Sequence, residues 1–382
     1  MIRRRAAARS PLLVGVPVVF VATVLLLPSR ELVDGRYPPA FSGWSSTGMV
    51  AAGAVSATCA CWSTSRLRRA GWLARRWRRR TDLIVMRSSV LVGAVIAATV
   101  YAGAVLAAGF QGVFGIPASQ VWVPMTAILV GWAVLGASAG AARVLPIPLA
   151  LIAAIIVPYV ATVFPPAVEP LWLRHLTGYW PDCCTATDSV DPRASVAAVM
   201  MSLALVGLGA STLGSSSGRR TPSRWAVLVG TVALAGVSLL VVSGLGASPT
   251  VVRPADELRC SGSPSACLWP EHQRLRSVVE RGQARSTELL RILGLSAPDV
   301  ITERPARNAV VIVADDRDTP ASIAAEAVRG RIFRDVSPCT TRVGAAAVAA
   351  AELERIAASA ASVDPQTASR PIDTSTFQAG RN

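Results

Sequence analysis

The sequence predicts an α-helical integral membrane bundle of about seven transmembrane helices, followed by a small exported α/β domain. Three observations support this fold class. Of 382 residues, 52% are hydrophobic and 16% are charged, whereas soluble globular chains carry about 25% charged residues. Apolar runs long enough to cross a bilayer recur as far as Leu245. From about Ala247 onward, polar and apolar residues alternate with turn signals, which is typical of a water-exposed domain.

The predicted transmembrane domain, residues 1–246, contains seven apolar runs: 11–27, 47–62, 83–110, 121–142, 147–164, 196–213 and 225–245. Each is near the roughly 20 residues that cross about 30 Å of hydrocarbon, although the second run is short. The basic N-terminus followed by an apolar run also fits a cleaved signal peptide. Because no small-x-small cleavage pattern follows that run, we favour a retained first span.

The segment from Arg66 to Arg80 orients the chain. It reads RLRRAGWLARRWRRR and contains no acid and eight arginines: Arg66, Arg68, Arg69, Arg75, Arg76, Arg78, Arg79 and Arg80. Short loops rich in arginine stay on the cytoplasmic side. With the N-terminus inside, the cytoplasmic segments 1–10, 63–82, 141–146 and 214–224 hold 16 arginines, and the outer loops 28–46, 109–120 and 165–195 hold four. We therefore expect a multi-pass plasma-membrane protein with its C-terminal region outside.

The same arginine-rich segment has two functional interpretations. Its apolar residues recur at helical spacing, at Leu67, Ala70, Leu73, Ala74 and Trp77. This pattern predicts a helix in the membrane interface, with its arginines against anionic lipid head groups. One interpretation is topology and lipid anchoring alone. The other is a docking element for a cytoplasmic partner.

The predicted exported domain covers residues 247–361. It begins with two short β-prone stretches around a Ser/Gly/Pro turn, ELRCSGSPSACLW, which predict a hairpin. A helix is expected from Pro270, because proline suits the first helical position. A buried strand is expected over 308–316, and further helices over 319–333 and 344–359. The polar tail, residues 362–382, is predicted to be disordered.

The seven cysteines divide by predicted compartment. Cys59 and Cys61 lie in the second span, where buried thiols are ordinary packing residues. The other five are predicted outside, where disulfides form, and are structural disulfide candidates: Cys183, Cys184, Cys260, Cys267 and Cys339. Cys260 and Cys267 flank the hairpin at a separation that a bridge can span. One of Cys183 or Cys184 could then pair with Cys339; because five is odd, one thiol is left over, and the sequence does not identify it.

Several function classes are excluded or disfavoured. The chain has no lysine, so it lacks the residue with which a P-loop reaches phosphates. The spans contain no Asp or Glu near their centres, which disfavours an ion-coupled transporter. Acids and arginines balance from Pro254 onward, 16 of each, so the net charge of +15 marks topology rather than nucleic-acid binding. No standard zinc spacing is matched by His175, His272, Asp182 and the cysteines. We expect that the protein binds no metal and no cofactor and that it is not an enzyme.

The segment from Cys260 to His272, CSGSPSACLWPEH, resembles one found in a group of actinobacterial multi-pass membrane proteins. In that group a Cys-Leu-Trp-Pro-Glu-His-like segment opens an uncharacterised exported domain. The spans of these proteins are similar to the permease side of ABC-2-type transporters. The resemblance covers the spans in outline and residues 254–340 more closely. It implies structural roles for Cys260 and Cys267, and no catalytic residue.

Two functional hypotheses follow. The first is a non-catalytic permease-type subunit of an ABC exporter, which works with a separately encoded ATP-binding subunit at the 63–82 loop. The second is a membrane-anchored sensor or envelope-interaction protein that acts through its outer domain. The chain departs from plain six-span permeases by its seventh span and its large outer domain. Both hypotheses include contact with the lipid bilayer, and both leave a homo-oligomer open.

Overall fold

In the computed structural model, the chain divides into two compact units, Met1–Val252 and Arg253–Asn382. The structure describes residues 10–27, 37–69, 78–113, 122–142, 145–181, 183–215, 222–246, 248–262, 265–292, 295–298, 300–304, 309–312, 314 and 318–336. The division falls after Val252 rather than at 246, because the strand that contains residues 250–252 pairs within the first unit. Each unit is described by itself.

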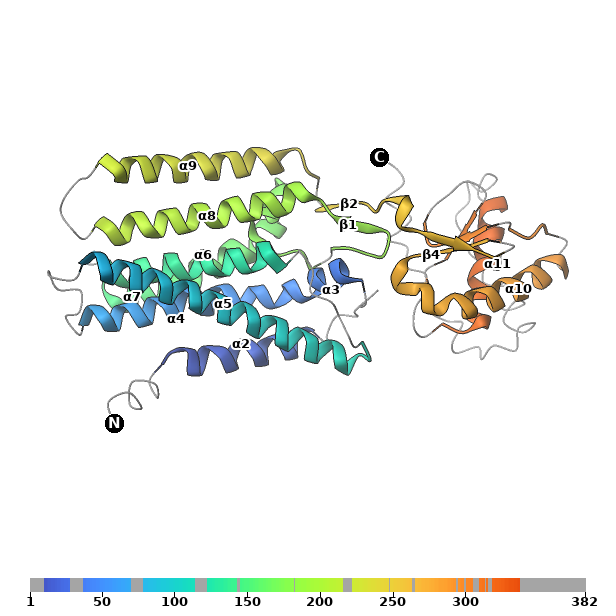
Figure 1. The fold of residues 1–382 in the computed structure, drawn as a ribbon, viewed down its shortest axis with the longest axis horizontal. Helices are drawn as coiled ribbons and strands as arrows, with labels where there is room; N and C mark the ends of the chain where they lie inside the picture. The colour runs from blue at the N-terminus through green and yellow to red at the C-terminus, as the bar shows by residue number, and fades with distance from the viewer. Residues whose placement is uncertain are drawn as a thin grey trace. The chain divides into compact units, whose positions relative to one another are not determined.

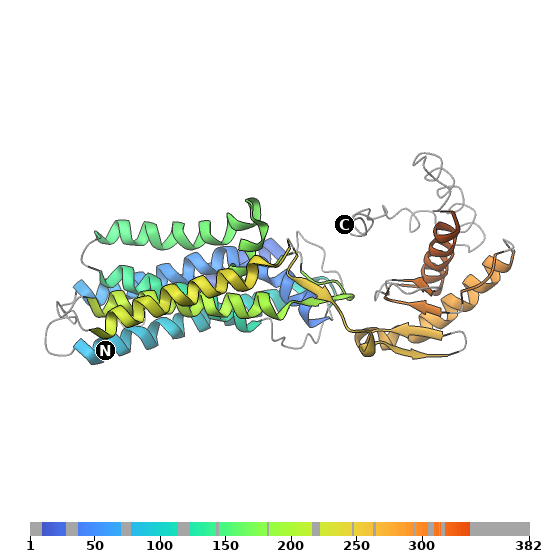
Figure 2. The ribbon, with the colours of Figure 1, turned by 90° about the horizontal axis from the view of Figure 1, so that it is seen from above.

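The first unit is a bundle of long helices that lie side by side (Figures 1 and 2). In chain order these are α2 (Leu12–Leu26), α4 (Met49–Arg69), α5 (Arg78–Phe110), α6 (Trp122–Ala141), α7 (Ile147–Val163), α8 (Pro192–Ser215) and α9 (Pro222–Ser243). Helix α4 packs against α6, α7, α5 and α2, whereas α9 packs mainly against α8. Helix α4 is therefore central, and α9 lies at the edge of the bundle.

Among the described residues, five helices are long and apolar enough to cross a membrane: Leu83–Phe110, Trp122–Ala141, Ile147–Ala167, Pro192–Leu213 and Trp225–Ser243. The other two predicted spans differ for separate reasons. Helix α2 is apolar but has only 15 residues. Helix α4 has 21 residues, but serine, threonine and cysteine interrupt its apolar sequence and three arginines fill its last turn.

Small residues bring α4 and α6 into close contact. A Cβ added to Gly136 would lie 2.2 Å from the carbonyl oxygen of Ala57, and one added to Gly140 would lie 2.3 Å from that of Cys61. The Ser56 hydroxyl donates a hydrogen bond of 2.9 Å to the carbonyl oxygen of Leu129 on α6. Glycines one helical turn apart allow backbones in a bilayer to approach this closely. This seam forms the centre of the bundle.

One end of the bundle, called here the capped end, consists of residues 37–48, 165–191 and 244–252. It contains helix α3 (Pro38–Ser45) and the strands β1 (Asp188–Val190) and β2 (Thr250–Val252), which pair antiparallel. Two prolines begin α3, and its residues from Ala40 to Ser45 are all buried. The sequence predicts this segment only as an outer loop. The Ser46 hydroxyl accepts a hydrogen bond of 2.9 Å from the backbone N–H of Trp180, which joins two of the capping segments.

The opposite end, called here the basic end, is where α4, α6 and α8 finish and α5, α7 and α9 begin (Figure 1). Helix α4 finishes at Arg69 and α5 begins at Arg78. Helix α6 finishes at Ala141, one residue before the carbonyl that Arg68 contacts. The arginine-rich segments of the sequence therefore connect helices at one end, away from the capped end.

The second unit contains a four-stranded sheet in the order β3 (Arg259–Ser261), β4 (Ser265–Leu268), β5 (Val300–Thr302) and β6 (Ala309–Val311). Strands β3 and β4 form the predicted hairpin, and β4, β5 and β6 run parallel. Helices α10 (Arg276–Ile292) and α11 (Pro320–Val336) complete the fold, with apolar residues of both packed in a core with the sheet. A 3₁₀ turn, Pro270–Leu275, precedes α10, so the helix predicted from Pro270 begins six residues later as an α-helix.

Some predictions for this unit differ from the structure or cannot be compared with it. The strand expected over 308–316 is shorter, at Ala309–Val311. Strand β5 is not predicted. The helix expected over 344–359 and the tail 362–382 lie outside the described residues.

Candidate functional site

The structure pairs four of the five candidate cysteines. Cys260 and Cys267 are joined, on facing positions of β3 and β4. Cys183 and Cys184 are joined to each other, so neither forms the bridge to Cys339 that the sequence left open. The backbone at Cys184 has a φ of 73°, which turns the two neighbouring side chains toward each other. Cys339 lies outside the described residues.

The structure describes part of the arginine-rich segment. Arg66, Arg68 and Arg69 lie in the last turn of α4. The Arg68 guanidinium donates a hydrogen bond to the carbonyl oxygen of Ala142, and Arg66 lies 5.7 Å from the centre of the Trp62 ring. Arg75 and Arg76 lie outside the described residues. Arg78, Arg79 and Arg80 form the first turn of α5, and their side chains are likewise outside the description.

The second unit buries a charged cluster on the segment that carries the resemblance. Trp269 is fully buried, and the Arg253 guanidinium lies 4.2 Å from the centre of its ring. Arg253 also forms ion pairs of 2.6 Å with Glu257 and with Glu271. Cation–π contact and two carboxylates together compensate the cost of burying the guanidinium. The residue that begins the second unit is thus firmly held within it.

A buried histidine–carboxylate pair lies beside this cluster. His272 Nδ1 is 2.5 Å from Glu303 Oε1, and both side chains are almost completely buried. The carboxylate also accepts backbone N–H groups from Trp269 at 2.7 Å and from Ala314 at 3.2 Å. These residues follow β4, β5 and β6, so Glu303 joins the ends of three parallel strands. Because both carboxylate oxygens of Glu303 are buried and already accept hydrogen bonds, we interpret the His272–Glu303 pair as a structural clamp rather than a catalytic dyad.

Sequence reasoning missed Arg253 and Glu303. The available signal for Glu303 was an acid directly after the short apolar stretch Val300–Thr302, at the end of a strand. The local pair with Glu257 did not single out Arg253, because its contacts with Trp269 and Glu271 join residues that are distant in the chain.

A second polar arrangement occupies the capped end. His175 is fully buried, and its Nε2 is 2.9 Å from the carbonyl oxygen of Gly246. Burial lowers the pKa of His175, and nearby Arg174 lowers it further, while the Gly246 bond and Asp191 oppose the shift. Asp191 pairs with Arg193 at 2.8 Å, and the hydrogen bond from Arg193 is the main reason that the pKa of Asp191 is lowered. His175 and His272 lie in different units, and among the described residues no three His, Cys, Asp or Glu side chains gather as metal ligands.

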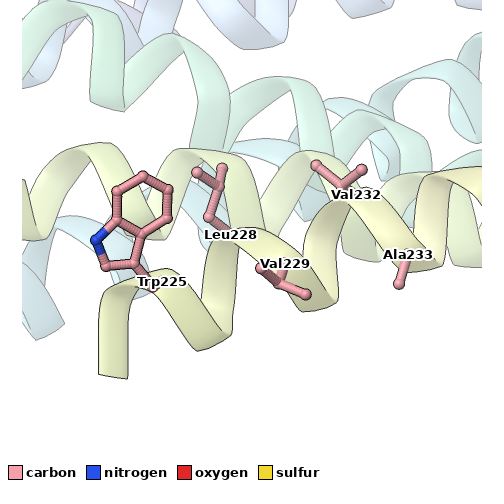
Figure 3. Close-up of a pocket in the computed structure, with 5 residues that line it drawn as sticks. All are labelled: Trp225, Leu228, Val229, Val232 and Ala233. Atoms are coloured by element: carbon pink, nitrogen blue, oxygen red, sulfur yellow. The ribbon is translucent and has the colours of Figure 1, made fainter. Parts of the chain in front are cut away.

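Figure 3 shows a shallow apolar groove on α9. Its lining residues all come from this one helix: Trp225, Leu228, Val229, Val232 and Ala233. Apart from the Trp225 indole N–H, their side chains offer no polar group, so the groove suits hydrocarbon rather than a charged or polar ligand.

No protein-family model, no curated protein and no solved structure matches the chain. Function is therefore inferred from the residues of this chain alone.

Proposed function

We propose that this chain is a multi-pass plasma-membrane protein whose helical bundle anchors and presents an extracytoplasmic α/β domain, and that this domain binds a component of the cell envelope. The observation that carries the proposal is the packing of the capped end. Six consecutive residues of α3, from Ala40 to Ser45, are buried there. A Cβ added to Gly43 would lie 2.6 Å from the carbonyl oxygen of Cys183, so the capping segments are in close contact. A filled end suits an anchor better than a solute path.

The proposed topology is seven spans, with the N-terminus inside and the second unit outside. The arginine-rich connections at the basic end support it, since such loops stay in the cytoplasm. One disulfide lies in the capped end and the other lies within the second unit. Disulfides persist in oxidising compartments outside the cytoplasm. Helix α4 fits this topology because Ser56, Thr64 and Ser65 are buried against neighbouring helices instead of facing lipid.

A non-catalytic permease-type subunit of an ABC exporter is the second candidate. One observation favours it. Arg68 fastens the end of α4 to the end of α6, while Arg66 and Arg69 remain exposed beside that contact. A fixed basic surface of this kind suits docking of a separate ATP-binding subunit with an acidic surface.

Cysteine labelling tests the topology. In intact cells, a membrane-impermeant maleimide is expected to label Ala284→Cys, an exposed position of α10. Arg69→Cys, exposed at the basic end, is expected to react only after the membrane is permeabilised. The reverse pattern would contradict the proposed orientation.

Affinity purification tests the two functions. A tag on the N-terminus is used to recover the full chain from native membranes after crosslinking in cells, and partners are identified by mass spectrometry. The envelope-binding proposal expects an envelope component that is retained by Arg66→Gln/Arg69→Gln. The permease candidate expects a stoichiometric P-loop ATPase that this double variant loses and that Arg281→Gln, an exposed change on α10, retains. An ATPase without any envelope component would overturn the first proposal.

A further inference from the structure

The chain that leaves α9 is fastened to the segment between α7 and α8 by three separate contacts. Strand β2 pairs with β1 along three residues of each strand. The backbone N–H of Asp191 donates a hydrogen bond of 2.7 Å to the carbonyl oxygen of Pro249. His175 contacts the carbonyl oxygen of Gly246 at 2.9 Å. Residues 244–252, called here the strap, are thus held at both ends within the first unit.

The His175 contact is the only one of these three that involves a side chain, and that side chain titrates. A carbonyl oxygen accepts only, so Nε2 must carry the proton that it donates to Gly246. The other ring nitrogen, Nδ1, is buried and has no partner among the described residues. A neutral imidazole with an unprotonated Nδ1 suits this environment. A second proton, on Nδ1, would create a buried positive charge and a buried N–H donor that has no acceptor, and both are unfavourable.

The charged groups near His175 do not supply that acceptor. Arg174, on the same 3₁₀ segment, disfavours a second positive charge. Asp191 favours it, but the Asp191 carboxylate already accepts the side chain and backbone N–H of Arg193. Glu169 precedes this segment and is exposed. Of the helices that pack on the 171–177 segment, α8 contributes Arg193, which is paired with Asp191. The facing parts of α7 and α9 contribute no charged residue, since Ile147–Val163 and Trp225–Ser243 contain none.

From this geometry we propose that His175 is an acid-sensitive latch, which holds the strap to the 171–191 segment when neutral and releases it when protonated. The sign follows from the direction of the pKa shift. Burial lowers the pKa of His175 from 6.5. The latched state therefore binds fewer protons than the released state as pH falls through about 6.5, and its stability decreases over that range. Below the lowered pKa, both states are protonated and no further loss is expected.

The latch senses acid outside the cell only if the capped end faces outward, so this part of the inference rests on the proposed function. Its test does not, because a detergent-solubilised chain exposes both ends to the same buffer. Hydrogen–deuterium exchange of the full chain is measured at pH 7.5 and 5.0, with the intrinsic pH dependence of exchange removed. We expect peptides covering 188–190 and 250–252 to exchange faster at pH 5.0 than at pH 7.5, because protonation of His175 favours the released state. Unchanged protection of these peptides would overturn the proposal.

Three variants assign the effect to His175. His175→Gln keeps an N–H donor and cannot titrate, so its strap is expected to exchange equally at both pH values. His272→Gln removes the other histidine of the chain and is expected to keep the acid response of the strap. Asp191→Asn withdraws the negative charge that favours protonation, so the response is expected at lower pH. An acid response that persists in His175→Gln, or that is unmoved in Asp191→Asn, would contradict the latch.

Discussion

Helices α6 and α9 belong to the same bundle but differ in what surrounds them. In the 18-residue apolar stretch with which each helix could cross a membrane, 67% of α6 is buried inside the protein, whereas only 11% of α9 is buried. The two sequences differ in the same sense. Helix α6 presents Gly136 and Gly140 to its neighbour α4, and α9 exposes large apolar residues such as Val232 and Leu240. In this bundle the most apolar surfaces face outward, and small residues fill the centre.

Helix α4 extends the comparison. The sequence predicts a span over 47–62, and the α4 found there is more polar than the five helices that are apolar enough to cross a membrane. It is nevertheless the helix around which the others pack. Most of its hydroxyl groups donate to backbone carbonyls, either within α4, as for Thr64, or on α6, as for Ser56, although the buried hydroxyl of Ser65 has no hydrogen-bond partner among the described residues. Because lipid solvates apolar side chains and cannot solvate polar ones, the polar helix belongs inside.

The largest expected effect comes from placing a charge on the exposed face of α9. Val232 lies near the middle of this helix and is 65% exposed. If lipid covers it, Val232→Arg should cost about 3 kcal/mol of membrane insertion. The fraction of protein integrated into membranes measures this cost. Ser277→Arg, an exposed change on α10, is the control and should integrate normally. Normal integration of Val232→Arg would mean that α9 does not face hydrocarbon.

A smaller effect is expected from adding one methyl group to the seam. A Cβ on Gly136 would overlap the Ala57 carbonyl, so Gly136→Ala should cost about 2 kcal/mol. Gly230 of α9 has nothing within 4 Å of such a Cβ, and Gly230→Ala should be neutral or slightly stabilising. Unfolding in mixed micelles compares the two variants. Equal stability of both would refute the close α4–α6 contact.

The smallest effect concerns one hydroxyl. Ser56→Ala removes the hydrogen bond to Leu129 on α6 and should cost about 1 kcal/mol. Ser238 is also buried, but its hydroxyl bonds to Ala235 of its own helix. Ser238→Ala should therefore change the unfolding free energy less in the same assay. If Ser238→Ala lowered the unfolding free energy more than Ser56→Ala, the interpretation of the α4–α6 seam as the stabilising contact would be wrong.

Features with a local signal could be predicted from the sequence. The apolar run 83–110 coincides with the span-length part of α5, because run length alone defines such a helix. The Cys260–Cys267 hairpin was predictable from its turn residues. Helix α3 was not, because PPAFSGWS is short and its burial depends on contacts with residues near Cys183.

The candidate sites were less predictable than the fold. The pairing of Cys183 with Cys184 was not predicted, because compartment alone does not distinguish a bridge between neighbours from one to Cys339. The clamp at Glu303 and the contact of His175 with Gly246 each join segments that are distant in the chain. Hydropathy and spacing carry no information about such pairings.

The pairing of β1 with β2 also constrains how the protein is made. Helices α8 and α9 lie between the two strands in the chain, so β1 has no partner while the ribosome is still producing those helices. The segment before α8 can complete its hydrogen bonds only after residue 252 has been synthesised and released from the insertion machinery. A chain that stops short of Gly246 would leave both β1 and the ring of His175 without their partners.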